Sequence, residues 1–175
     1  MLPILQLIVD TVASVLGGVL LLRFWMQAIR VRPPASVAQF TFTLSDWLVK
    51  PLRRIVPGAG GYDWASLIGA FLVVLLASSI LFLAGASAEQ VLLVALGRFV
   101  KWIIYGFIAL LIIEAIFSWV NPHAPLAPFV HALNDPLLRP IRKVVPPIGG
   151  LDLSVLVAVL LLQIALYLLR TVVPV

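Results

Sequence analysis

The chain has 175 residues, of which 63% are hydrophobic and only 11% charged, and its mean hydropathy is +1.17. This apolar share is far above that of a soluble globular domain and indicates an integral membrane protein. With no cysteine, the chain has no disulfide framework and no thiolate chemistry. In a membrane protein a net charge of +5 is explained by basic residues that keep loops in the cytoplasm. No nucleic acid partner is therefore predicted.

Four apolar stretches are long enough to cross a hydrocarbon core of about 30 Å, which takes roughly 20 helical residues. The second stretch carries no charge and the fourth carries none before Arg170, whereas the first and third contain isolated charged residues. We therefore expect an all-α membrane protein with four transmembrane helices. Their predicted bounds are about 4–29, 64–86, 91–120 and 153–170.

One sequence unit occurs twice. Residues 39–63 align without a gap with residues 128–152, 89 positions later, and 11 of the 25 aligned residues are identical. Such self-similarity predicts two structural units, 1–89 and 90–175, each composed of a span, a basic segment and a second span. Because both units would enter the membrane from the same side, we predict parallel repeats related by an axis near the membrane normal.

The two basic segments, 36–57 and 125–146, place apolar residues at steps of three and four, which is one face of a helix. A basic amphipathic helix lying in the headgroup plane is the natural interpretation. Pro51 and Pro140 predict a kink or break in each helix. The basic residues on the other face are candidate docking residues for anionic lipid headgroups or a protein partner: Lys50, Arg53, Arg54, Arg139, Arg142 and Lys143.

The positions of the charges also predict topology. Eight of the twelve basic residues lie in the two segments that follow the first and third spans, and the positive-inside rule assigns these segments to the cytoplasm. Both termini are then expected outside. Asp63 and Asp152 directly precede the second and fourth apolar stretches, where they are candidate N-caps of those helices.

A pair of charges within the spans suggests a contact between the two halves. Arg23 and Glu114 lie at matching depths of the first and third spans and have no partner nearby on their own helices. Since an unpaired charge in the membrane is costly, we predict an ion pair between them that holds the halves together. The alternative is that Arg23 extends to the headgroups while Glu114 is protonated or lines a polar crevice.

The sequence resembles a known family in two motifs, NDPLLRPIRK at 134–143 and LLLRFWMQ at 20–27. These are similar to motifs of the YggT family of small bacterial membrane proteins, which has plastid relatives. The first copy departs from the pattern at Trp47 and Val49, where the second copy has Pro136 and Leu138. The resemblance implies a multi-pass protein of the bacterial cell (inner) membrane. Family members are associated with cell-division or cell-shape gene neighbourhoods, with osmotic or ion homeostasis and, in plastids, with assembly of haem-bearing cytochrome complexes.

The residues do not suggest enzyme chemistry. His123 and His131 lie in the second basic segment without a triad-like set of residues, and Gly58, Gly60 and Gly61 lack the Lys and Ser/Thr of a phosphate loop. No catalytic residue, metal or cofactor is therefore predicted. The basic segments are open to three interpretations: topology and lipid anchoring alone, a docking platform for a partner, or the mouth of a conduction path.

From these observations we expect a non-enzymatic scaffold or assembly factor linked to cell division, the envelope or membrane-complex biogenesis. Its expected partners are anionic lipids and another membrane or division-related protein. The alternative is a component of ion or osmolyte movement.

Overall fold

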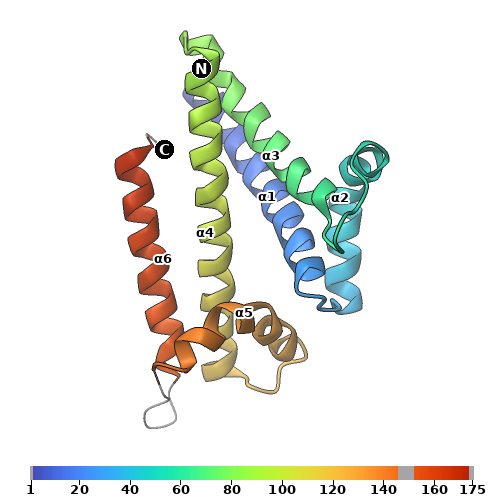
Figure 1. The fold of residues 1–175 in the computed structure, drawn as a ribbon, viewed down its shortest axis with the longest axis vertical. Coiled ribbons are helices and arrows are strands. Elements are labelled where there is room, and N and C mark those ends of the chain that lie inside the picture. The colour runs from blue at the N-terminus through green and yellow to red at the C-terminus, as the bar shows by residue number, and fades with distance from the viewer. Residues whose placement is uncertain (1, 146–151, 174–175) are drawn as a thin grey trace.

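The computed structural model describes residues 2–145 and 152–173, which are mostly helical and form no β-strand. The described residues form six α-helices and one 3₁₀ helix, η1, which continues directly from α3; Figure 1 shows their arrangement. Their bounds are α1 Leu2–Ala28, α2 Ala35–Ile55, α3 Trp64–Ser78, η1 Ser79–Ala84, α4 Ala88–Val120, α5 Ala127–Arg142 and α6 Leu153–Val172.

Four of these segments are long and apolar enough to cross a membrane: α1 from Ile4, α3 together with η1, α4 and α6. They coincide with the four predicted apolar stretches, so this part of the prediction is confirmed. We refer to them as the span helices. The 33 residues of α4 extend about 50 Å at 1.5 Å per residue, which is well beyond a hydrocarbon core of about 30 Å.

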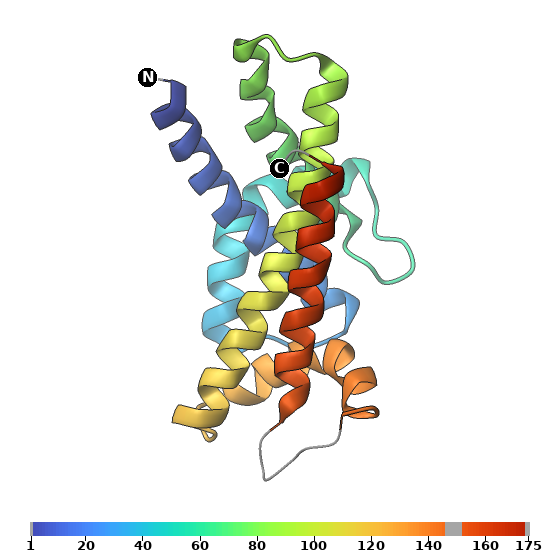
Figure 2. The ribbon, with the colours of Figure 1, turned by 90° about the vertical axis from the view of Figure 1, so that its left-hand side faces the viewer.

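The span helices pack around two separate buried clusters. α1 packs mainly on α3, while α4 contacts α3 on one side and α6 on the other. The first cluster, which includes Leu20, Val49 and Val73, lies among α1, α2 and α3, and the second, around Leu111 and Leu138, lies among α4, α5 and α6. In both views the start of α1 and the end of α6 lie at one end of the molecule, and α5 lies at the other (Figures 1 and 2).

The prolines do not break the two intervening helices. α2 is continuous from Ala35 to Ile55 through Pro51, and α5 is continuous through Pro136 and Pro140. A proline removes one helical hydrogen bond and crowds the carbonyl four residues before it, and a bend relieves this crowding. Figures 1 and 2 show that α2 changes direction along its length, so of the two predicted outcomes α2 shows a kink and not a break.

The two intervening helices differ in their course. α5 crosses the end of α4 and lies against α6, whereas the first part of α2 runs back from the end of α1 beside α1 and α3 (Figures 1 and 2). Three buried residues nevertheless occupy matching positions in the two helices, Thr41, Ser45 and Val49 in α2 and Val130, Asn134 and Leu138 in α5, while Leu133 is buried in α5 alone.

Candidate functional site

Charged residues gather in two places where a span helix, an intervening helix and the start of the next span helix meet. We name each group after its span residue. The Arg23 cluster consists of Arg23, Ser45, Asp46, Lys50, Arg53 and Asp63. The Glu114 cluster consists of Glu114, His131, Asp135, Arg139, Arg142 and Asp152.

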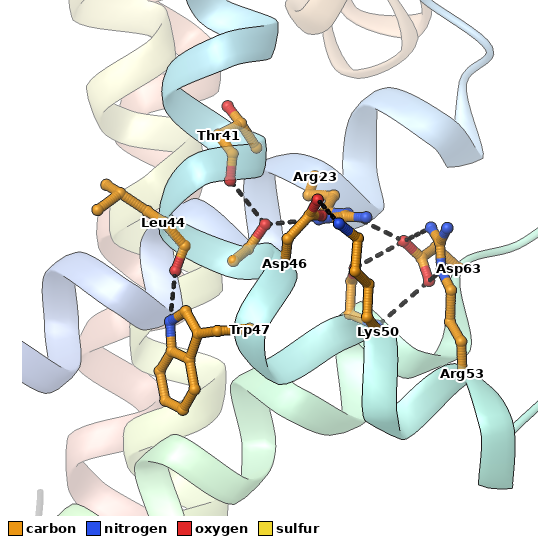
Figure 3. Close-up of polar contacts among 10 residues, drawn as sticks. Arg23, Thr41, Leu44, Asp46, Trp47, Lys50, Arg53 and Asp63 are labelled. Carbon is orange, nitrogen blue, oxygen red and sulfur yellow. Dashed lines mark hydrogen bonds and ion pairs between the residues drawn. The ribbon is translucent and has the colours of Figure 1, made fainter.

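At the centre of the Arg23 cluster is a buried guanidinium, only 6% exposed, on α1 (Figure 3). Arg23 Nη1 donates to Asp46 Oδ1 at 2.7 Å and to Ser45 Oγ at 2.6 Å, both on α2. Its Nε lies 3.4 Å from Asp63 Oδ2, just before α3. Because a buried charge is costly unless it is paired, these contacts hold three helices in one arrangement.

Asp63 is the N-cap of α3 and is 2% exposed. It accepts hydrogen bonds from the backbone N–H and the hydroxyl of Ser66, and Arg53 Nη2 donates to Oδ2 at 2.6 Å. Burial would raise the pKa of the Asp63 carboxyl, but the hydrogen bonds from Arg53 and Ser66 outweigh it and hold the pKa below its usual value. This carboxylate therefore stays ionised while it caps a helix and binds two arginines.

The outer part of the Arg23 cluster is open to solvent. Lys50 lies 2.9 Å from Asp46, one helical turn away, and is 73% exposed. The hydrogen bonds from Arg23 and then Lys50 lower the pKa of Asp46. Arg54 is exposed and, in the described part of the chain, has no carboxylate oxygen within 4.0 Å.

At the centre of the Glu114 cluster is a carboxylate on α4, which is 11% exposed. His131 Nδ1 lies 2.8 Å from Glu114 Oε1, and Arg142 Nη2 lies 3.4 Å from the same atom. Arg142 Nη2 is also 2.7 Å from Asp152 Oδ2. Asp152 is the N-cap of α6, where its side chain accepts from the backbone N–H of Ser154 at 3.0 Å.

Asp152 also has a depressed pKa. Its burial would raise the pKa, but hydrogen bonds from Ser154 and Arg142 lower it further than burial raises it. On the outer side of the cluster, Asp135 lies 2.6 Å from Arg139, one turn along α5. Asp135 Oδ1 is also 3.9 Å from Arg142 Nη1, so Arg142 is shared among three carboxylates.

The structure corrects the predicted ion pair between Arg23 and Glu114. Arg23 binds Asp46 and Asp63, and Glu114 binds His131 and Arg142, so each residue takes partners from its own half of the chain. The prediction considered depth along the span but not the intervening helix that folds back beside it. Nor does Arg23 extend freely to the headgroups, because it is buried.

A different ion pair joins the first and third span helices. Asp10 of α1 accepts a hydrogen bond of 2.8 Å from Arg98 Nη1 of α4. The sequence showed both residues as isolated charges within apolar stretches, but nothing in their spacing, 88 residues apart, indicated that they meet.

One aromatic position was also missed. Phe42 and His131 are 89 positions apart and so correspond in the sequence alignment. The Arg23 guanidinium carbon lies 4.9 Å from the centre of the Phe42 ring, while His131 binds Glu114. At this position a phenyl ring contacts the positive Arg23 in the first half, and an imidazole ring contacts the negative Glu114 in the second half. Aligning the motif with the span residues could have indicated this, whereas His131 was considered above only as a candidate member of a catalytic triad.

Two further contacts fix α5 to the span helices. Asn134, which is fully buried, donates from Nδ2 to the Leu110 carbonyl of α4 at 2.9 Å. Trp25 Nε1 of α1 donates to the Leu133 carbonyl of α5 at 2.9 Å, so the second intervening helix also contacts the first half.

Chemically, the two clusters are sets of ion pairs whose exposed cations face outward, although in the part of the chain that the structure describes Arg23 Nε and Glu114 Oε2 are buried without a hydrogen-bond partner. Among the described residues, no group of three His, Asp or Glu side chains could hold a metal ion. The carboxylates of the Arg23 cluster are already neutralised by guanidinium and ammonium groups, so the cluster is suited to positioning helices. Its exposed cations are suited to attracting anions.

Together, the fold and the clusters define a helical protein with four candidate membrane spans, whose two intervening helices are held to them by buried charges. The chain belongs to the CCB3/YggT family, whose family model matches residues 1–84 and 93–173.

Relatives of similar length support this membership. An Escherichia coli K12 protein called "Uncharacterized protein YggT" is 33% identical over 168 residues, covering 91% of this chain and 86% of the relative. A Vibrio alginolyticus protein is 33% identical over 177 residues, covering 94% and 92%. One from Pseudomonas aeruginosa is 36% identical over 164 residues, covering 90% and 83%. No solved structure matches the chain.

Proposed function

We propose that the chain is a non-enzymatic scaffold or assembly factor of the bacterial cell membrane, acting in division, envelope or membrane-complex biogenesis. The observation that carries this proposal is the way α2 is presented. Arg23 and Asp63 hold α2 on its span helices, while the large apolar side chains of Phe40, Trp47 and Ile55 are exposed. A rigidly held helix with an exposed tryptophan has the character of a protein-binding surface, because ordering it on binding costs little entropy.

The chemistry of the α2 surface indicates the class of partner. Lys50 and Arg54 follow Trp47 by three and seven residues, so all three share one side of the helix. An apolar group beside two cations suits a partner segment with apolar and acidic residues, and it also suits anionic lipid headgroups. The corresponding position to Trp47 in α5 is Pro136, so this surface belongs to the first half only.

We also propose that residues 1–89 and 90–175 are parallel repeats with cytoplasmic basic segments and external termini. The matching ion pairs Arg53–Asp63 at 2.6 Å and Arg142–Asp152 at 2.7 Å support the repeat. Arg98 lies near the opposite end of the spans, where a basic residue favours the reverse orientation. Its ion pair with Asp10 largely neutralises this charge.

The orientation is tested by thiol labelling of intact cells, because the natural chain has no cysteine. A cysteine at Ser36 or Ala127 should be shielded from an impermeant reagent, and one at Ser87 should react. The opposite labelling pattern would overturn the orientation.

A second candidate function, ion or osmolyte movement, draws on the charges within the span helices. Asp10, Arg23, Arg98 and Glu114 are all engaged in ion pairs, which favours a structural role over a conduction path. Purified protein in liposomes should therefore pass K⁺ no faster than protein-free vesicles. A flux that responds to substitution of Arg23 or Glu114 would favour conduction instead.

The scaffold proposal is tested by site-specific photo-crosslinking in native membranes. A benzophenone amino acid at Trp47 should give a discrete protein adduct, and the adduct should weaken when Lys50 and Arg54 are both replaced by Gln. The matched control is the same probe at Leu160, an exposed residue of α6. Lipid adducts alone at both positions would count against a protein partner on α2.

A further inference from the structure

A cavity of about 610 Å³ with one basic wall lies beside the end of α1 and is bounded by α2 on its other side. Its basic wall is formed by Arg23, Arg30, Arg32, Lys50 and Arg53, and Asp46 is the carboxylate that lines it. Two of these residues, Arg30 and Arg32, come from the connection between α1 and α2 and are not part of the repeated motif.

The cavity has more cations than its carboxylates neutralise. Arg23 and Lys50 share Asp46, and Arg53 binds Asp63, which also contacts Arg23. Within the described chain, neither Arg30 nor Arg32 has a carboxylate oxygen within 4.0 Å. Five basic residues therefore face two acids, and most of the excess positive charge lies on the two arginines of the α1–α2 connection.

The backbone at Arg30 gives an independent indication. Arg30 has φ +57°, the left-handed region, and is the only residue other than glycine with positive φ among those described. The bonds Val31 N–H to Met26 O and Arg30 N–H to Gln27 O form the helix-ending turn in which glycine is the ordinary occupant of this position. A strained arginine in place of glycine implies that its side chain serves a purpose that glycine could not.

The Arg30 side chain also lies beside the Gly60-Gly61 turn. A β-carbon at Gly61 would meet Arg30 Nη2 at 4.0 Å, and Gln27 Nε2 lies 3.5 Å from the Gly61 carbonyl oxygen. These contacts bring the end of α1 and the turn before α3 to one side of the cavity.

We propose that this cavity binds the phosphate group of an anionic ligand, either the headgroup of a phospholipid or a soluble phosphate compound. Arginine guanidinium groups bind phosphate through paired hydrogen bonds, and several of them around one cavity favour a group that carries more than one acceptor oxygen. The cavity shares Lys50 with the α2 surface proposed above, but the inference does not depend on the scaffold function, because Arg30 and Arg32 lie in the α1–α2 connection.

The second half of the chain offers no counterpart. In the alignment that pairs Arg23 with Glu114, 91 positions apart, Arg30 and Arg32 correspond to Asn121 and His123. We therefore expect one phosphate site per chain.

The test uses the purified full-length protein in dodecyl maltoside. Retention of dioleoylphosphatidylglycerol is measured against dioleoylphosphatidylcholine by native mass spectrometry, and the melting temperature is measured with inorganic phosphate against chloride at equal ionic strength. In Arg30→Gln/Arg32→Gln, binding of the active probe should weaken about tenfold or more, as expected for loss of charged hydrogen bonds. The matched control, Lys101→Gln/Arg170→Gln, removes the same charge on α4 and α6, outside the cavity, and should change binding by less than about twofold.

A single substitution separates binding from folding. Arg30→Gly should raise the melting temperature by about 2 °C, because glycine adopts positive φ without strain, and should weaken phosphate binding at the same time. A merely structural Arg30 would not produce this opposite pair of effects.

The two probes distinguish the sources of the phosphate. Preferential retention of phosphatidylglycerol identifies a lipid headgroup site, and stabilisation by inorganic phosphate alone identifies a soluble ligand; either supports the proposal. It is overturned if neither probe binds, or if Arg30→Gln/Arg32→Gln binds as well as the wild type. It is likewise overturned if the control double variant loses binding equally.

Discussion

The Arg23 and Glu114 clusters are built on the same positions with opposite central charges. In the first, a buried arginine is surrounded by carboxylates; in the second, a carboxylate is surrounded by Arg142 and His131. They also differ in access to solvent, since Asp63 is 2% exposed and Asp152 36%. In both halves the motif attaches an intervening helix to its span helix through ion pairs. The sign of the charge on the span helix differs between the halves, and the residues that contact it differ accordingly.

The largest expected effect is the loss of stability on replacing the central residue of each cluster, and it should be greater for the more deeply buried Arg23 than for Glu114. Replacing Arg23 by Gln leaves Asp46 and Asp63 without their shared guanidinium and should lower the free energy of unfolding by about 3 kcal/mol or more. Replacing Glu114 by Gln should cost about 1–2 kcal/mol, because Arg142 keeps its other carboxylates. Reversible denaturation in mixed micelles measures both, and an equal or larger loss at Glu114 would contradict the ranking.

A second experiment converts one cluster into the other. Glu114→Arg alone should cost about 2 kcal/mol, since it places a cation beside His131 and Arg142. Adding His131→Phe supplies the ring that Phe42 offers Arg23 and should recover about 1 kcal/mol. The four variants of the double-mutant cycle give the coupling, and a coupling of zero would show that the ring and the span charge vary independently.

The two capping aspartates allow a comparison by pH. The pKa of Asp63 and of Asp152 is lower in the folded protein than the ordinary value near 4, so each contributes stability that is full above that value and is lost as pH falls through the depressed pKa. Wild-type unfolding free energy should therefore decline below about pH 4.

Substitution by Asn keeps a capping side chain and removes the charge. Asp63→Asn should cost about 2 kcal/mol at pH 7 and reduce the acid dependence, because Arg53 and Arg23 lose an ionised partner. Asp152→Asn should cost about 1 kcal/mol or less, since that site is screened by solvent. Thermal unfolding of both variants across pH 3 to 7 measures these losses. Equal losses for Asp63→Asn and Asp152→Asn would contradict the distinction between a buried and a solvent-exposed cap.

The smallest effects belong to the outer ion pairs. Lys50 and Arg139 are each paired with an aspartate one turn earlier, and both are mostly exposed. Replacement of either by Gln should change the unfolding free energy by about 0.5 kcal/mol or less, and high salt should erase the difference. A loss above about 1 kcal/mol at Lys50 alone would indicate that the Arg23 cluster extends to its exposed edge.

Several parts of the architecture follow directly from local sequence. Four charge-poor stretches of sufficient length predict four span helices, and an aspartate just before an apolar run lies where α3 and α6 begin. Each signal is local, because it depends on hydropathy or on the first turn of one helix.

What the sequence could not predict depends on the rotation and packing of whole helices. The depth of Arg23 along α1 was visible, but whether it faced α4 or α2 depends on how the α1–α2 connection folds back, which hydropathy does not encode. The polar residues Thr41 and Ser45 are buried, while the apolar Phe40 beside them in the sequence is exposed. The long basic side chains extend to solvent from the rim, which leaves small polar residues free to pack against the span helices.

The ion pair between Asp10 and Arg98 has a consequence for biosynthesis. The ribosome adds residues in order, so α1 enters the membrane with Asp10 and Arg23 long before their partners exist. Arg23 is matched once residues 46 and 63 have been made, whereas Asp10 must wait for a partner 88 residues further along. The first helix therefore carries an uncompensated carboxylate through the insertion of the next span, and reaches its final position only when α4 arrives.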